Sequence, residues 1–301
     1  MNKELINSSH INKEGEYEWW YFDFVGEDRS AFNIVLHASD IFGIKRGTYY
    51  SASALLAGNE KLYLKGRDKD FPVGNFGEYL FANNNYFYEN KDIIKFNLHF
   101  ENGAALTGEI EKTFTPEPIN NGVLYESSQG FGVWLPRIIN GKFKADLILG
   151  GVEKRLKGYA YHDHQCGNLP IQRYISDWIW GHFNGDNEAV VFFKITTQDG
   201  QDINRFYVFD GGDEKFGKFP IETSFLKDLA TADKPEGANL KAELGLRSAS
   251  LGFEVSPAGL MRSRINEKVE DKLFTYLRWE ADGLLNFKRP LRGVSEYMKF
   301  R

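Results

Sequence analysis

The sequence lacks several features that define whole classes of protein. Cys166 is the only cysteine among the 301 residues, so a disulfide within the chain is impossible. No stretch approaches the roughly 18 consecutive apolar residues of a transmembrane helix. The first residues also lack the apolar run of a signal peptide. We therefore expect no integral membrane segment and a cytoplasmic location.

A surplus of basic residues and the loops that bind nucleotides are missing as well. The chain has 37 basic and 42 acidic residues and a net charge of −5, with no long run of Lys or Arg. A nucleic-acid partner is therefore not expected. The glycine patterns GxGxxG, the P-loop and GxSxG do not occur. Their absence disfavours Rossmann dehydrogenases, phosphoryl-transfer enzymes and α/β-hydrolases.

Aromatic residues and turn signals are abundant instead. Phe, Trp and Tyr make up 15% of the chain, and strands accommodate such side chains well. The strand-like runs 93–100 and 104–112 flank Asn102-Gly103, and two similar runs flank Asp199-Gly200. Such dipeptides favour type I′ turns between antiparallel strands. The pattern therefore predicts an all-β protein built from hairpins.

Breaks in the strand pattern indicate how the chain is divided. The stretch 167–174 interrupts the strands, so we expect one domain over residues 1–168 and a second over 169–301. Helical periodicity is scarce and predicts one short helix around 221–229, capped by Thr223 or Ser224. Residues 231–239 are polar and rich in turn formers, which predicts a long loop.

A short pattern occurs twice in the chain. Residues 17–32 and 176–190 align at a fixed offset, with a polar turn and a second apolar run after each copy. The aligned pairs are Glu18 with Asp177, Trp19 with Trp178, Tyr21 with Trp180 and Phe24 with Phe183. This similarity predicts a tandem of two related units.

The densest cluster of reactive side chains comes just before the second copy. Because side chains alternate along a strand, Tyr161, Asp163 and Gln165 are expected on one face, and His162 and His164 on the other. A carboxyl group in an aromatic pocket has a raised pKa and can donate a proton. Aromatic faces also stabilise carbocations. Asp163 is thus a candidate acid for protonating an electron-rich alkene.

Three other interpretations of the cluster remain open. His162 and His164 could bind a metal, but a site needs further ligands, and no HExxH or cysteine-rich spacing is present, so we predict no metal site. Cys166 could act as a nucleophile with His164 as its base. Asp163 and the histidines could also form a hydrogen-bonded network that ties the two domains together.

Aromatic residues of both copies are candidates for a substrate pocket. Trp178 and Trp180 share a face of their strand, whereas Trp20 lies on the opposite face from its neighbour Trp19. Apolar ligand sites are lined by such rings and by a few polar groups. We predict that Trp20, Tyr21, Gln165, Trp178 and Trp180 contact the substrate.

Four motifs together resemble a known group of proteins. They are EWWYFDF at 18–24, YHDHQCGN at 161–168, DWIWGHF at 177–183 and LRGVSEYMKF at 291–300. In this order and spread over nearly the whole chain, they are similar to the carotenoid 1,2-hydratase (hydroxyneurosporene synthase)-like superfamily with its AttH-like members. Relatives in this group include hydratases of isoprenoid double bonds and fungal Diels–Alderases of polyketide biosynthesis.

This resemblance implies two tandem lipocalin-like antiparallel β-barrel domains packed side by side, and no cofactor. In the hydratases a Tyr-x-Asp stretch is thought to supply the acid, and Tyr161-His162-Asp163 matches it. Many relatives have a Trp where this chain has Cys166, so the substrate pocket is expected to differ.

The expected function follows from the cluster and the resemblance together. We expect an enzyme that hydrates, cyclises or isomerises a C=C bond of a hydrophobic isoprenoid or polyketide. Asp163 would be the acid, and Tyr161, His162 and His164 would orient it or deliver water. The alternatives are a pericyclase that pre-folds a polyene and a non-catalytic carrier of a lipophilic ligand. The sequence does not specify the oligomeric state.

Overall fold

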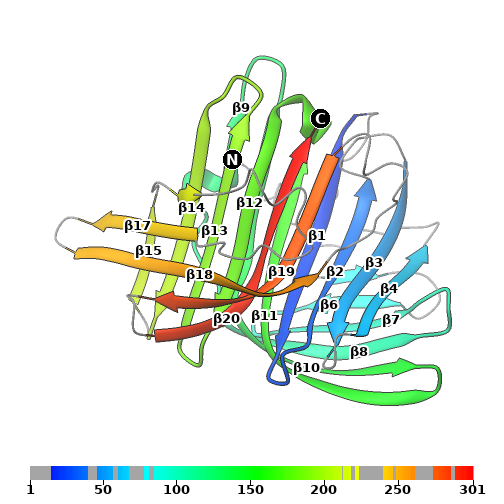
Figure 1. The fold of residues 1–301 in the computed structure, drawn as a ribbon. Coiled ribbons are helices and arrows are strands. Elements are labelled where there is room, and N and C mark those ends of the chain that lie inside the picture. The colour runs from blue at the N-terminus through cyan, green and yellow to red at the C-terminus, as the bar shows by residue number, and fades with distance from the viewer. Residues whose placement is uncertain are drawn as a thin grey trace. The chain divides into compact units, whose positions relative to one another are not determined.

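The computed structural model describes residues 15–39, 46–56, 60–67, 78–80, 85–211, 213–217, 221–223, 240–246, 249–261, 274–285 and 289–300. The chain divides into two compact units, Met1–Ile171 and Gln172–Arg301. In the described part of the chain, the elements are antiparallel strands and two short 3-10 helices, Ile119–Gly122 and Ile171–Arg173 (Figure 1). The predicted all-β class is confirmed.

The first unit is an 11-stranded antiparallel sheet. The order of its strands is β4-β3-β2-β1-β11-β10-β8-β7-β6-β5, and β9 pairs with β10. The strands are β1 (Tyr17–Gly26), β2 (Ala31–Ser39), β3 (Arg46–Leu56), β4 (Glu60–Arg67), β5 (Glu78–Leu80), β6 (Tyr86–Glu89), β7 (Ile93–His99), β8 (Ala105–Phe114), β9 (Val123–Glu126), β10 (Phe131–Leu149) and β11 (Val152–Gly167).

The second unit is a nine-stranded antiparallel sheet in the order β15-β14-β13-β12-β20-β19-β18-β17-β16. Its strands are β12 (Ile175–Asn184), β13 (Glu188–Thr197), β14 (Asp202–Asp210), β15 (Asp213–Gly217), β16 (Ile221–Thr223), β17 (Leu240–Leu246), β18 (Ala249–Met261), β19 (Phe274–Leu285) and β20 (Arg289–Phe300).

The repeated sequence pattern forms the equivalent strand in both units. β1 opens the first unit and lies between the second strand, β2, and the last, β11. β12 opens the second unit and likewise lies between β13 and β20. The predicted tandem of related units is therefore confirmed, since each copy pairs with the next strand and with the last strand of its unit.

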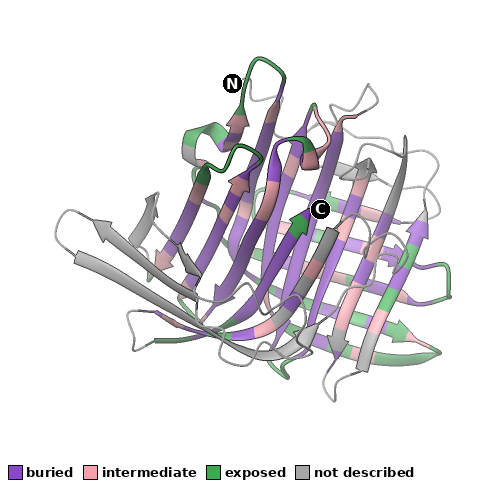
Figure 2. Ribbon diagram, turned by 45° about the horizontal axis from the view of Figure 1, so that its top comes forward, coloured by how far each residue is buried: buried purple, intermediate pink, exposed green. Residues whose placement is uncertain are grey.

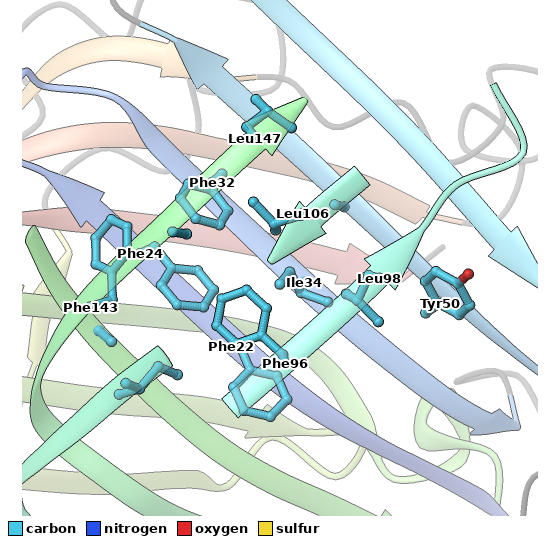
Figure 3. Close-up of a cluster of buried hydrophobic side chains, with 14 of the residues drawn as sticks. Phe22, Phe24, Phe32, Ile34, Tyr50, Phe96, Leu98, Leu106, Phe143 and Leu147 are labelled. Carbon is cyan, nitrogen blue, oxygen red and sulfur yellow. The ribbon is translucent and has the colours of Figure 1, made fainter. Parts of the chain in front are cut away.

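One face of β1 builds the main core of the first unit. Phe22, Phe24, Phe96 and Phe143 belong to one cluster of buried side chains, and Figure 3 shows them pointing toward one another. The Phe24 ring lies 5.0 Å from that of Phe143, in an edge-on arrangement. Full burial of each such side chain contributes about 1.5–3 kcal/mol, so this alternate set of residues fixes which face of β1 turns inward.

The other face of β1 is also buried. All ten residues of the strand are buried, as Figure 2 shows for the central strands of this sheet. An antiparallel strand with a solvated face would alternate between buried and exposed residues. The face that carries Trp19, Tyr21 and Asp23 is therefore a second protected environment, separate from the core cluster.

The hairpins are confirmed, but the predicted turn type is wrong. β7 pairs with β8 around Asn102-Gly103, and β13 pairs with β14 around Asp199-Gly200. A type I′ turn needs positive φ at both central residues, yet only Gly103 (φ 79°) and Gly200 (φ 83°) have it. The Asn102 Oδ1 accepts a bond from the Ala104 amide, which favours a three-residue loop ending in a left-handed glycine.

Two further expectations concern the second unit and membranes. Residues 221–223 form strand β16 rather than the start of a helix. The remainder of the predicted helix and the predicted loop at 231–239 lie outside the described residues. None of the helices found in the described ranges has the length and apolarity needed to cross a membrane.

Candidate active site

The reactive cluster lies at the centre of the first sheet. β11 pairs with β1 on one side and with β10 on the other. Asp163 stands opposite Tyr21 of β1 and Pro136 of β10. Side chains directly opposite each other in an antiparallel pair are within contact distance, so the three strands together define what surrounds this carboxyl group.

Three donors bind the Asp163 carboxyl group. The Tyr161 hydroxyl donates to Oδ2 at 2.7 Å, and the Trp134 indole N–H donates to the same oxygen at 2.9 Å. The Trp134 N–H is also 3.2 Å from the Tyr161 oxygen, so the three groups form a closed triangle. The Gln165 amide approaches the other oxygen, Oδ1, at 3.4 Å. Asp163 is only 1% exposed.

The two oxygens of the Asp163 carboxyl group differ in the hydrogen bonds that they accept. Oδ2 receives two short bonds and is suited to carry negative charge or to act as the carbonyl oxygen of a protonated acid. Oδ1 has a longer contact and is the oxygen that would hold a transferable proton. Hydrogen bonds in a buried environment are stronger than in water, so Tyr161 and Trp134 would stabilise the carboxylate that remains after proton transfer.

Aromatic rings cover the same face of the sheet. The Tyr21 ring meets the Tyr161 ring edge-on, with centroids 6.4 Å apart. The Trp19 ring lies 5.0 Å from that of Tyr17, and both are buried. A carboxyl group surrounded by such rings is largely shielded from water, and their faces attract cationic charge.

The two histidines of the cluster lie on the opposite face, toward the core. His164 Nε2 is 2.8 Å from Glu18 Oε1, and its ring stacks on Trp20 with centroids 4.8 Å apart. His162 stacks on Phe22 of the core cluster with centroids 4.0 Å apart. The alternation predicted from the sequence is thus observed, and it separates both histidines from the Tyr161–Asp163 face.

His162 is held in its neutral form. Its Nδ1 lies 3.0 Å from the Tyr21 carbonyl oxygen, which can only accept, so Nδ1 carries the proton. Burial lowers the pKa of His162 to about 3, a shift only partly offset by the nearby carboxylate of Glu89. The imidazole is therefore uncharged at neutral pH.

The structure also bears on the metal and thiol interpretations. Over the ranges that the structure describes, no group of three or more His, Cys, Asp or Glu is arranged to hold a metal ion. Cys166 is buried, and burial together with the Glu18 carboxylate raises the pKa of its thiol. A nucleophilic cysteine needs the opposite shift, which argues against Cys166 in that role.

The predicted substrate residues fall into three groups. Tyr21 and Gln165 share the face of Asp163, whereas Trp20 lies on the core face of the same strand as Tyr21. Trp178 and Trp180 belong to the second unit, where both are buried. Their roles in binding a substrate remain predictions.

Sequence reasoning missed Trp134, although it donates to Asp163. The Gly150-Gly151 turn between β10 and β11 is recognisable, but counting back from it does not give the correct partner. Register shifts between Pro136 and Ile138, and again between Ile138 and Gly141, intervene. These bulges place Trp134 opposite Gln165, and nothing in the sequence marks where they occur.

Comparisons with known proteins define the class of fold. No family model and no curated protein matches this sequence. Several solved structures match with probability 1.00, and three of them illustrate the likeness. A protein from Nitrosomonas europaea described as AttH is 13% identical, with a TM-score of 0.64 and coverage of 95% of this chain and 93% of that one.

The other two matches are of similar quality. CghA in complex with Sch210972 is 10% identical with a TM-score of 0.68, and the match covers 98% of this chain and 94% of that one. Kievitone hydratase from Nectria haematococca is 14% identical with a TM-score of 0.62, covering 98% and 97%. The chain therefore has the lipocalin-like fold of AttH, and the resemblance seen in the motifs is confirmed at the level of the fold.

Proposed function

We propose that this protein is an enzyme that protonates a C=C bond of a hydrophobic natural product, such as an isoprenoid or polyketide, without a cofactor. The observation that carries the proposal is the buried Asp163 carboxyl group, whose Oδ2 accepts hydrogen bonds from Tyr161 and Trp134. General acids of this kind are buried carboxyl groups with oriented oxygens.

The proposed reaction begins with transfer of the Asp163 Oδ1 proton to an alkene carbon. The π pair forms the new C–H bond, and the neighbouring carbon becomes a cation that the faces of Tyr21 and Tyr161 stabilise. Attack by water gives hydration, attack by a second alkene gives cyclisation, and loss of a neighbouring proton gives isomerisation. In each case a proton returns to the Asp163 carboxylate, so the acid is regenerated.

The solved structures with this fold support a small-molecule substrate. One is named a hydratase, and another contains the small molecule Sch210972. The matched lengths cover nearly all of each chain, so the fold is shared in both units. These likenesses support the class of reaction, whereas the choice of Asp163 rests on the hydrogen bonds at this site.

Incubation with a lipophilic extract of the source organism in D2O, followed by mass spectrometry, tests the proposal. We expect a new product that carries deuterium on carbon, because the transferred proton exchanges with solvent. Asp163→Asn keeps the shape of the side chain but has no carboxyl proton, so this variant should form the product at least about 100-fold more slowly. A folded Asp163→Asn variant with full turnover would remove Asp163 from the reaction.

A pericyclase is the second candidate, favoured by the aromatic rings that cover the Asp163 face of the sheet. A shaped apolar site can hold a polyene folded and lower the barrier by orientation. Such an enzyme would give a new isomer without deuterium. An unchanged compound that binds saturably would instead indicate a carrier.

A further inference from the structure

The internal repeat gives Asp163 a counterpart in the second unit. Tyr21 of β1 stands opposite Asp163 of β11, and Trp180 of β12 stands opposite Glu296 of β20. Tyr21 and Trp180 are aligned in the repeat, so Glu296 occupies the position of Asp163. A second aligned pair gives the same correspondence. Glu18 pairs with Cys166, and Asp177 pairs with Lys299, so each partner lies three residues after the acid.

The donors around Glu296 are of the same chemical types. The Tyr276 hydroxyl donates to Oε2 at 2.6 Å, and the Trp178 indole N–H donates to Oε1 at 3.3 Å. The Arg278 guanidinium contacts Oε2 at 3.5 Å. A phenol and an indole thus bind this carboxyl group, as they bind Asp163.

The strand positions of the donors also correspond. Tyr276 lies on the strand before the last one of its unit, opposite Met298, two residues after Glu296. Trp134 lies on the strand before the last one of the first unit, opposite Gln165, two residues after Asp163. The equivalent position therefore supplies a hydrogen-bond donor to the acid in both sheets, although the residue type differs.

The two oxygens of Glu296 are also unequal, but here the phenol and the indole bind different oxygens, whereas both bind Oδ2 of Asp163. Oε2 is close to the phenol, while Oε1 has a contact of 3.3 Å with the indole. The Glu296 side chain is 12% exposed, whereas Arg278 beside it is 1% exposed. The Glu296 side chain is therefore not fully sealed from solvent, whereas the Arg278 guanidinium is.

The Glu296 carboxyl group keeps its proton to a higher pH than an ordinary glutamate does. Burial raises the pKa of Glu296, and Arg278, Tyr276 and Trp178 offset this only in part. Across the sheet, burial and Arg278 lower the pKa of His182 to about 3, so this imidazole is neutral. The remaining ionisable residues on the same face of β19 are Glu280, opposite Val294, and Asp282, opposite Arg292.

We propose that Glu296 is the proton donor of a second acid site, built at the strand positions that correspond to Asp163, which takes an uncharged lipophilic molecule bearing a basic atom. The ligand is uncharged because burial of a further net charge at this site would be costly. The rings of Trp178 and Trp180 supply apolar surface beside the acid. This site does not depend on the role proposed for Asp163.

Dicyclohexylcarbodiimide is the probe, because it is lipophilic and uncharged and reacts with a carboxyl group only after taking its proton. The Glu296 proton moves to one carbodiimide nitrogen, and the carboxylate oxygen adds to the central carbon as one C=N π bond is lost. The resulting O-acylisourea rearranges to a stable N-acylurea. Peptide mapping of the full-length protein at pH 7 then locates the adduct.

Glu296 should be labelled several-fold faster than the exposed Glu153, because burial raises the pKa of Glu296 and the reagent reacts with the protonated carboxyl group. Glu89 is a buried control that should stay unlabelled: burial opposes its ionisation, but Arg137 and Lys112 contribute to a net lowering of its pKa. Labelling of Glu296 no faster than Glu153 in the native protein would overturn the proposal.

Two variants complete the experiment. Glu296→Gln should lose this adduct, and Asp163→Asn should retain it, because the two carboxyl groups lie in different units. The wild-type labelling rate decides the matter even where Glu296→Gln does not fold. Failure of the Asp163 proposal shows instead as unchanged deuterium incorporation in Asp163→Asn, which leaves the labelling of Glu296 unaffected.

Discussion

At the scale of single residues, the geometry around Asp163 depends on one shared donor. The Trp134 N–H contacts both Asp163 Oδ2 and the Tyr161 oxygen, so it fixes the position of these two side chains relative to each other. The alternation of side chains along β11 allowed the sequence to predict that Tyr161 and Asp163 share a face. It could not supply Trp134, because that contact depends on bulges in another strand.

Trp134→Phe should lower turnover about tenfold or more, because it removes a hydrogen bond to the carboxylate formed in the reaction; bonds to charged groups contribute about 1.5–3 kcal/mol. Steady-state kinetics with the substrate found in the D2O experiment measures this. Tyr161→Phe removes the other donor to Oδ2, and the double variant should lose less than the two single losses combined. Unchanged turnover in both single variants contradicts the role assigned to Oδ2.

The neutral His162 predicts a pH dependence of stability. Burial lowers its pKa to about 3, whereas the unfolded chain has an ordinary histidine value near 6.5. Above pH 6.5 His162 is neutral in both the folded and the unfolded state, so its lowered pKa costs no stability there. As the pH falls below 6.5, only the unfolded state gains the proton, so stability decreases by about 1.4 kcal/mol per pH unit.

Urea unfolding of wild type and His162→Phe between pH 7 and pH 5 isolates this effect. Phe preserves an aromatic ring next to Phe22 but cannot titrate. The unfolding free energy of the wild type minus that of His162→Phe should fall between pH 7 and pH 5, because only the wild type loses stability as the pH falls. A constant difference over this range contradicts the assignment of a depressed pKa to His162.

At the scale of elements, β1 and β11 are joined by a buried hydrogen bond between two side chains as well as by their ladder. Glu18 and His164 are both fully buried, with 2.8 Å between Oε1 and Nε2. Glu18→Ala should destabilise the protein by about 1–3 kcal/mol, because removal of one partner leaves the other buried without this hydrogen bond. Chemical denaturation measures the change.

The matched control for this prediction is Glu27→Ala, directly after the end of β1. Glu27 and Lys157 form an ion pair at 2.6 Å, but their side chains are 57% and 69% exposed. Solvent screens such a pair, so the loss should be below about 1 kcal/mol. Equal effects of the two substitutions would show that burial does not strengthen the Glu18–His164 pair.

Many strands and the hairpins between neighbouring strands could be predicted from the sequence, but the pairing of distant strands could not. The strand runs on either side of Asn102-Gly103 and Asp199-Gly200 follow from local composition, and they form the expected hairpins. Their turn type depends on side-chain bonds such as that of Asn102, which dipeptide statistics do not contain. The correspondence between Glu296 and Asp163 can be recognised only when the pairing of strands far apart in the sequence is known.

At the scale of the whole molecule, Cys166 reports the opening of the first unit. It is the only cysteine, it is 3% exposed, and burial and Glu18 raise the pKa of its thiol. The native protein should therefore resist iodoacetamide at pH 8, since the thiolate is the reactive form. Labelling across a urea titration should follow the unfolding of this unit. Rapid alkylation of the native protein would contradict the burial of Cys166.

The pairing of first and last strands within each unit has a consequence for how the chain folds. Tyr17 pairs with Gly167 in the first unit, and Asp177 pairs with Lys299 in the second. Contacts between such distant residues slow folding, because a long loop must close before they form. During synthesis the central ladder of the first unit cannot assemble until β11 has left the ribosome, and the acid site forms with it. Most of the first unit must therefore wait, partly folded and with its apolar faces uncovered, for the strand that carries Asp163.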